Sequence, residues 1–172
     1  LLGYPVEEKG MNYVYQNYDG LLYIVPAKTW YMPEKIADLR LEIPLSQEYY
    51  AAHLPVYPAF ISLLAPLFGY LQSMIVVTVF FSIMAAIIFF VLLRKFELTP
   101  YPLMLSIIFL FLPRLFVIRA VGAPEMLFLA TIIASVYCFE KKQFFFASIL
   151  GAIAAATKTP GVLLFVAYSL VY

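Results

Sequence analysis

The chain has 172 residues, of which 65% are hydrophobic and only 12% are charged, and its mean hydropathy is +0.93. Soluble globular proteins carry about 25% charged residues, so the composition predicts an integral membrane protein and argues against a separate soluble domain. The net charge of +1 comes from scattered Lys and Arg residues without a long basic run, which argues against a nucleic-acid partner.

Residues 1–53 are expected to form the water-facing part of the chain. They carry seven acids and four Lys or Arg residues, more than half of all its charge. Pro and Gly interrupt this region too often for long helices, so we expect short helical turns joined by loops. Its many Tyr residues and its Trp suit either the headgroup level of a bilayer or stacking on a sugar.

Within this region, Asn17-Tyr18-Asp19-Gly20 places a lone carboxylate among aromatic residues, directly before the apolar run at residues 21–25. Asp before Gly is also typical of a simple turn. Asp19 therefore has two interpretations, a turn residue or an acid at the membrane surface.

The region from residue 54 to residue 93 contains no charged residue. Residues 55–69 are interrupted by prolines and would reach about 22 Å as a helix, against a hydrocarbon core of roughly 30 Å, so we expect them to lie in the membrane interface. Residues 71–93 would reach roughly 35 Å and are followed by Arg94-Lys95. We predict a transmembrane helix here, with its basic end in the cytoplasm.

Further apolar helices are predicted at residues 98–112, 126–139 and 144–156, although the last two are short as spans. The break before residue 126 contains Arg119 and Glu125. Charges at membrane depth are costly unless they are paired or hydrated, so both residues are site candidates. The alternative is a structural Arg119–Glu125 ion pair at a helix end.

If residues 55–69 do not cross the membrane and each later helix does, successive breaks alternate between its two sides. One side then holds Asp19, His53, Arg119, Glu125 and Lys158. The other holds Arg94, Lys95, Lys141 and Lys142, which the positive-inside tendency makes cytoplasmic. Because Arg114, Arg119 and Lys158 oppose that tendency, we predict that they bind an anionic group.

The two ends of the chain and its cysteine complete this picture. Cys138 is the single cysteine and stands among apolar residues, so it is interpreted as a small buried hydrophobe that forms no internal disulfide. The chain begins with Leu1 rather than Met and stops at Tyr172 inside an apolar run without a stop signal. We therefore expect it to be a fragment of a longer protein.

Four motifs at the breaks between apolar segments resemble those of GT-C type membrane glycosyltransferases, and the resemblance covers nearly the whole chain. Residues 17–20 look like the acidic motif of the family's first extracytoplasmic loop. Residues 53–69 resemble the His-Pro-Pro-Leu-Tyr juxtamembrane helix of protein O-mannosyltransferases and aminoarabinose transferases, and also the Phe-Pro-Leu-Tyr-Pro segment of GPI mannosyltransferases. Residues 119–125 are similar to the family's Arg-x-x-x-x-Pro-Asp/Glu element, and residues 157–161 to its Thr-Lys/Arg-x-Pro-Gly element.

The chain departs from the family pattern at two places. The motif around Asp19 has one acid where many relatives carry a pair, which argues against a metal requirement, so no cofactor is assigned and a divalent metal stays an open alternative. Leu54 replaces the first proline of the His-Pro-Pro variant. This change favours the GPI-mannosyltransferase-like branch or bacterial branches of the family.

The resemblance implies an all-α, polytopic transmembrane fold. It implies an extracytoplasmic loop with the catalytic motif at residues 1–53, a juxtamembrane helix at residues 54–69 and a transmembrane region at residues 70–172. Its implied site consists of Asp19 as catalytic base, Arg119 and Lys158 as ligands of the donor phosphate, and His53, Tyr57 and Glu125 as residues that orient the acceptor or substrate.

The reaction that the resemblance implies is inverting transfer of a hexose, such as mannose, from a polyprenyl-phosphate carrier to a lipid, glycan or protein acceptor. The implied location is a bacterial or archaeal plasma membrane or, in a eukaryote, the ER membrane. One alternative is a transporter or flippase, whose buried charges and broken helices line a pathway. Another is a non-catalytic membrane subunit whose first loop is an interaction surface.

Overall fold

The computed structural model describes residue 10, residues 20–39 and residues 46–171, and all regular structure within these ranges is helical. This confirms the predicted all-α class. The helices are α2 (Gly20–Thr29), α3 (Pro33–Asp38), α4 (Gln47–Ala51), α5 (Val56–Phe68), α6 (Tyr70–Lys95), α7 (Pro102–Phe111), α8 (Pro113–Val121), α9 (Glu125–Glu140), α10 (Phe144–Ala155), the 3-10 helix η1 (Thr159–Val162) and α11 (Leu163–Val171).

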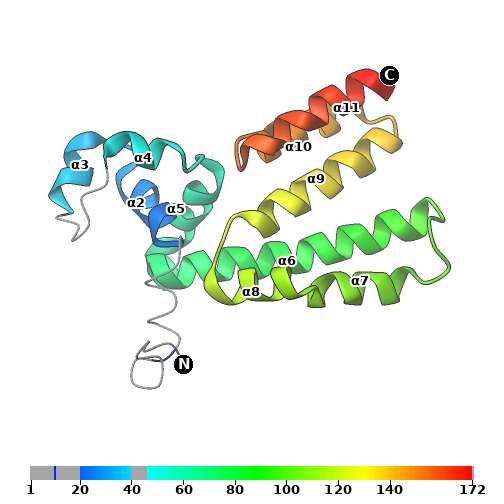
Figure 1. Ribbon diagram of the computed structural model, residues 1–172, viewed down its shortest axis with the longest axis horizontal. Coiled ribbons are helices and arrows are strands. Elements are labelled where there is room, and N and C mark those ends of the chain that lie inside the picture. The colour runs from blue at the N-terminus through cyan, green and yellow to red at the C-terminus, as the bar shows by residue number, and fades with distance from the viewer. Residues whose placement is uncertain (1–9, 11–19, 40–45, 172) are drawn as a thin grey trace.

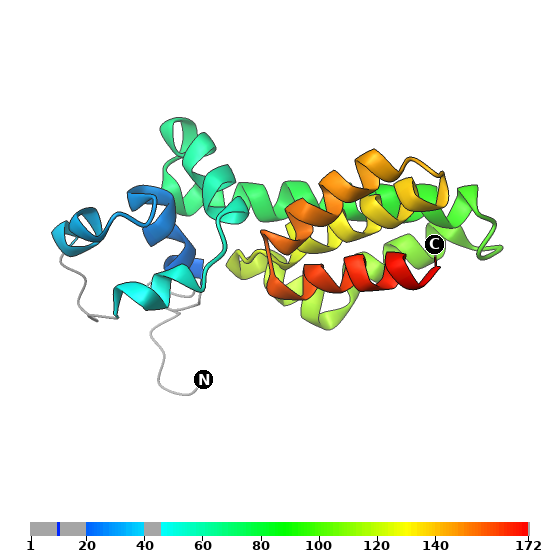
Figure 2. The ribbon, with the colours of Figure 1, turned by 90° about the horizontal axis from the view of Figure 1, so that it is seen from above.

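The longest helix, α6, runs through the molecule and connects its two parts (Figure 1). Helices α2 to α5 gather at the N-terminal end of α6, and we call them the head. Helices α7 to α11 lie along α6 and form with it the bundle (Figures 1 and 2). Within residues 1–53, for which frequent Pro and Gly residues predicted short helices, the described helices α2, α3 and α4 are short.

Helix α6, with 26 residues, is long and apolar enough to cross a membrane. It agrees with the span predicted for residues 71–93. Helices α7 and α8 meet the same criterion only when taken together, and they bend by 56° at their junction. The bend follows from Pro113, because a residue before proline avoids the helical conformation, and Leu112 is extended with ψ of 129°.

The polytopic arrangement stays a prediction, because the other helices are short. Helix α9 has 16 residues and α10 has 12, fewer than the roughly 20 that a membrane crossing needs. The part of the chain that the structure describes therefore contains one helix able to cross by itself and one bent pair.

The outer surface of the bundle is apolar, whereas its inner contacts use small side chains. Small residues such as Ser82, Ala85 and Ala86 are buried on α6, and such residues let helix backbones approach closely. The large side chains that remain exposed include Phe80, Ile83 and Ile87 on α6, Leu103 and Phe111 on α7, Phe145 on α10, and Phe165 and Leu170 on α11. An apolar surface of this kind requires lipid or protein around it.

The contact between head and bundle is a hydrophobic core of its own. Its buried residues come from α2, α5, α6 and α9, and they are Ile24, Ala27, Tyr57, Ile61, Met74, Val77 and Leu127. Helix α5 runs across α6 instead of continuing along it (Figure 2), and the corner between them is Gly69 with φ of +80°. The head is therefore held against one end of the bundle, where the breaks before α9 and after α10 also lie.

Candidate functional site

An ion pair joins two of the chain breaks at the head end of the bundle. Lys158 Nζ donates a hydrogen bond of 2.7 Å to Glu125 Oε1, although the residues are 33 positions apart. The Lys158 side chain is 31% exposed and that of Glu125 is 23% exposed. The Arg119–Glu125 pair considered from the sequence is wrong, because Glu125 pairs with Lys158 and Arg119 donates to the Leu110 carbonyl.

The backbone after α10 sets the position of Lys158. Lys158 is extended, its N–H donates to the Ala154 carbonyl, and the Gly161 N–H donates to the Lys158 carbonyl. Gly161 packs so closely on α10 that a Cβ there would lie 2.4 Å from the Ala155 nitrogen. The motif at residues 157–161 therefore folds back tightly on α10 and presents Lys158 toward α9.

A polar contact with α6 sets the position of Glu125. Ala123, just before α9, donates its N–H to Thr78 Oγ1 at 3.1 Å. The Tyr57 hydroxyl lies 2.7 Å from the same Thr78 oxygen and donates to the Met74 carbonyl at 3.1 Å. Tyr57 is fully buried, so the structure places it in the packing between α5 and α6 and not on a surface where it could meet an acceptor.

The first residue of α2 also reaches this place. A Cβ at Gly20 would lie 2.9 Å from the Gly122 carbonyl oxygen and 2.7 Å from Met74 Sδ, so the start of α2 touches the break between α8 and α9. Asp19 precedes Gly20 in the sequence and lies outside the described residues. Among the residues of the acidic motif, the structure describes Gly20, and Gly20 lies at this end of the bundle.

His53 lies in an aromatic cluster of the head. Its ring is 4.7 Å from the Tyr23 ring, and Nδ1 is 3.3 Å from the Tyr49 carbonyl. Its own carbonyl accepts a hydrogen bond from the Tyr31 hydroxyl. Burial raises the pKa of Tyr31 to about 12, so this hydroxyl keeps its proton at neutral pH.

A hydrogen bond connects the head to the segment after α10. The Val56 N–H donates to the Ala156 carbonyl at 3.4 Å, which links the start of α5 to the break that carries Lys158.

Arg119 points back toward α7. Its Nη2 donates to the Leu110 carbonyl, and its guanidinium carbon lies 5.8 Å and 5.6 Å from the ring centres of Phe111 and Phe116. These contacts bridge the bend between α7 and α8. The structure thus separates Arg119 from the Glu125–Lys158 pair with which the sequence had grouped it.

Arg114 is the cation that shares a cavity with Glu125. The cavity has a volume of about 410 Å³ and is lined by Pro113, Arg114, Val117, Ile118 and Glu125. From the sequence, Arg114 was expected to bind an anionic group together with Arg119 and Lys158, but only Arg119 and Lys158 were assigned to the donor phosphate. We define the site as Arg114, Glu125 and Lys158 together with the start of α2.

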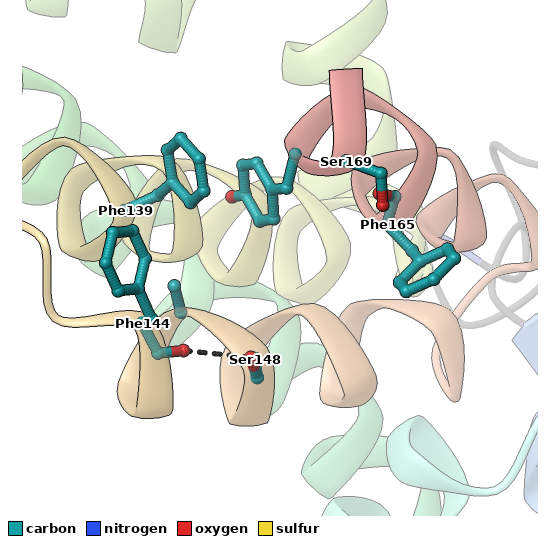
Figure 3. Close-up of a pocket in the computed structure, with 7 residues that line it drawn as sticks. Phe139, Phe144, Ser148, Phe165 and Ser169 are labelled. Atoms are coloured by element: carbon teal, nitrogen blue, oxygen red, sulfur yellow. Dashed lines mark hydrogen bonds between the residues drawn. The ribbon is translucent and has the colours of Figure 1, made fainter. Parts of the chain in front are cut away.

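A second cavity lies at the opposite end of the bundle and contains none of these residues. It has a volume of about 540 Å³ and is lined by Phe139, Phe144, Ala147, Ser148, Phe165, Tyr168 and Ser169. Figure 3 shows its aromatic side chains and the hydrogen bond from Ser148 to the Phe144 carbonyl. No charged side chain lines it, so it lacks groups for acid–base chemistry.

The ion pair is better suited to function than to stability. Partly exposed ion pairs contribute about 0–1 kcal/mol to stability. Moreover, Glu125 Oε2 is buried and has no hydrogen-bond donor among the described residues, which is unfavourable for a carboxylate. A role in binding or catalysis is one explanation for a buried carboxylate oxygen of this kind.

Replacing Arg119 by glutamine is expected to affect stability more than ligand binding. The variant loses a charge-assisted bond to the Leu110 carbonyl, a contribution of about 2 kcal/mol. Thermal unfolding in detergent should therefore shift to lower temperature. Arg114→Gln is the matched control, because no hydrogen bond of Arg114 crosses the bend in the described residues, and its unfolding should change little. Equal unfolding temperatures for Arg119→Gln and the unchanged protein would contradict the bridging role.

No group of three or more His, Cys, Asp or Glu residues that could hold a metal ion occurs among the described residues. Comparison of the chain with protein-family models, curated proteins and solved structures gave no match.

Proposed function

We propose that this protein is a membrane glycosyltransferase of the GT-C type, which transfers a hexose from a polyprenyl-phosphate carrier to a lipid, glycan or protein acceptor. The observation that carries the proposal is the Glu125–Lys158 pair beside the Arg114 cavity. It lies at the end of the bundle that Gly20, the residue after Asp19, also contacts. An acid motif and two cations close to one cavity suit a reaction in which a phosphate leaves.

The proposed membrane placement follows from the direction of the bundle helices. With α6 as a span and its exposed face in lipid, the head and the Glu125–Lys158 pair lie on one side. The ends of α6 and α9 lie together on the other side, since the ring centres of Phe96 and Tyr137 are 5.9 Å apart. The basic residues that follow there would be cytoplasmic by the positive-inside tendency.

The proposed mechanism uses the acceptor hydroxyl as nucleophile and Asp19 as general base. Asp19 takes the hydroxyl proton as the acceptor oxygen forms its bond to the anomeric carbon. The bond between that carbon and the phosphate oxygen breaks on the opposite side, its electron pair goes to the phosphate, and the configuration inverts. Lys158 and Arg114 stabilise the charge that develops on the phosphate. Arg114 takes the role that the sequence assigned to Arg119, because Arg119 is engaged at the α7–α8 bend.

Replacing Lys158 by glutamine tests the phosphate site. The variant is expected to bind a polyprenyl-phosphate-linked hexose about tenfold to a hundredfold more weakly, the scale of a lost charge-assisted bond to a phosphate. Binding would be measured with radiolabelled donor on the complete protein in detergent. Arg119→Gln is the control and should bind normally once corrected for the folded fraction. If Lys158→Gln binds donor normally and only unfolds more readily, Lys158 is structural and the proposed site is wrong.

Single-cysteine labelling tests the membrane placement. In a background with Cys138→Ala, we expect Lys35→Cys and Thr159→Cys to react with an impermeant maleimide from one side of the membrane. Lys95→Cys and Lys142→Cys should react from the other side. All four side chains are exposed in the structure, so accessibility does not bias the comparison. Labelling of positions 35 and 159 from opposite sides would rule out a shared site.

The bent α7–α8 pair favours a transporter or flippase as second candidate, because broken helices line many transport pathways. A transporter would move a lipid-linked sugar across the membrane of reconstituted vesicles without forming a glycosidic bond. Product analysis of the same vesicles separates the two functions.

A further inference from the structure

A third cavity lies on the head, where the turn after α2 meets α5. It has a volume of about 460 Å³, within the range of small-molecule sites, and is lined by Trp30, Val56, Ala59, Phe60, Ser62 and Leu63. It shares no lining residue with the Arg114–Glu125 cavity. Trp30 is 53% exposed and Leu63 is 71% exposed, so the cavity opens to the surroundings between apolar side chains.

The backbone holds Trp30 at this place against its conformational preference. Trp30 has φ of 50° and Tyr31 has φ of 62°, two successive non-glycine residues in the left-handed region. The Trp30 N–H donates to the Pro26 carbonyl, so Trp30 occupies the position after a helix where glycine is usual. Such conformations cost about 1 kcal/mol or more each, and they cluster at ligand sites. The turn at Trp30 is therefore a candidate for ligand contact.

The surroundings of the cavity match the level of membrane headgroups. Lys28, two residues before Trp30, places Nζ 5.1 Å from the ring centre of Tyr70. Tyr70 is the first residue of α6, so this cation lies where the proposed span begins. Helix α5, which forms the cavity wall, runs across α6 (Figure 2) and so would lie along the membrane surface. Tryptophan is enriched at that level.

We propose that the cavity binds one anionic phospholipid, whose acyl chain packs between Trp30 and α5 and whose phosphate pairs with Lys28. The apolar lining suits the chain, and Lys28, two residues before Trp30 and exposed, supplies a cation for the phosphate. This inference rests on the proposed membrane placement but not on glycosyl transfer.

Trp30 itself reports on the site, because it is the only tryptophan of the chain. The complete protein would be placed in nanodiscs with increasing fractions of phosphatidylglycerol or phosphatidylcholine brominated on the acyl chain. The measured quantity is the tryptophan fluorescence, and the contribution of Trp30 is the difference between the unchanged protein and a Trp30→Phe variant. We expect brominated phosphatidylglycerol to quench the Trp30 fluorescence half-maximally at a mole fraction at least threefold lower than brominated phosphatidylcholine. The quenching by phosphatidylglycerol should level off once the site is filled.

Two variants separate a built site from a tryptophan that merely lies in the interface. Ala59→Phe fills the cavity and should abolish the preference for phosphatidylglycerol, whereas Leu67→Phe, on an exposed position of α5 outside the cavity, should keep it. Lys28→Gln should make the two lipids equivalent. Equal quenching by both lipids in the unchanged protein, or an undiminished preference in Ala59→Phe, would overturn the proposal.

Two variants distinguish a failure of the proposed lipid site from a failure of the proposed enzyme function. Lys158→Gln should weaken donor binding while leaving the Trp30 quenching unchanged, because Lys158 does not line this cavity. Ala59→Phe should show the reverse pattern, with normal donor binding and altered quenching.

Discussion

Sugar transfer by an Asp19→Asn variant is expected to be slower by about a hundredfold or more, the usual scale for loss of an acid–base group. Asparagine keeps the shape and much of the hydrogen bonding of aspartate but cannot accept the proton of the acceptor hydroxyl. A general base acts in the transition state, so folding and donor binding should stay nearly unchanged. Turnover would be measured with a polyprenyl-phosphate-linked hexose, together with donor binding on the same preparation.

Asp38→Asn is the matched control for this experiment. Asp38 is an exposed acid at the end of α3 in the head, and its removal should leave turnover normal. The turn interpretation of Asp19 makes the opposite prediction, because asparagine is a good turn residue and would be tolerated. Near-normal turnover of a folded Asp19→Asn variant would support the turn interpretation of Asp19. Glu125 would then be the remaining candidate for the acid of the site.

A Gly161→Ala variant is expected to lose about 3 kcal/mol of stability, the upper range for an added group in a tightly packed place. A Cβ at this position would lie 2.4 Å from the nitrogen of Ala155, 2.6 Å from its Cα and 2.5 Å from the carbonyl carbon of Ala154. Because these are backbone atoms of α10, they cannot move aside as a flexible side chain would. The segment that holds Lys158 must shift, so donor binding should weaken as well.

Gly151→Ala provides the control, because Gly151 lies within α10, the helix on which Gly161 packs. A Cβ at Gly151 would approach only Ser135 Oγ at 3.6 Å and Leu164 Cδ1 at 3.8 Å, which are ordinary contacts. Alanine in a helix is favoured over glycine by about 0.5–1 kcal/mol, so this variant should unfold at the same or a higher temperature. If both variants unfold like the unchanged protein, the close packing of Gly161 on α10 is refuted.

Helix positions were largely predictable because they depend on local features of the chain. The charge-free run before Arg94 and Lys95 is long enough to cross a membrane, and α6 ends at Lys95 as expected. Residues 113–121, in contrast, were expected to be part of a break, and they form α8, which begins at Pro113 and ends before Gly122 with φ of +76°. Composition therefore sufficed for the all-α class and for α6, whereas Arg114 and Arg119 lie inside a helix and not in the predicted break.

Residue partnerships were not predictable, since they depend on how helices pack. The sequence offered Arg119, six positions before Glu125, as the nearest cation, yet the packing of α10 beside α9 brings Lys158 to Glu125 instead. The bend at Pro113 turns Arg119 toward the Leu110 carbonyl and leaves Arg114 at the cavity with Glu125. Likewise, only the crossing of α5 over α6 buries Tyr57 beside Thr78. The chain by itself determined the helical class and its one long apolar helix, and the tertiary structure decided which polar residues meet, because the Glu125–Lys158 pairing across 33 residues depends on helix contacts that no local pattern encodes.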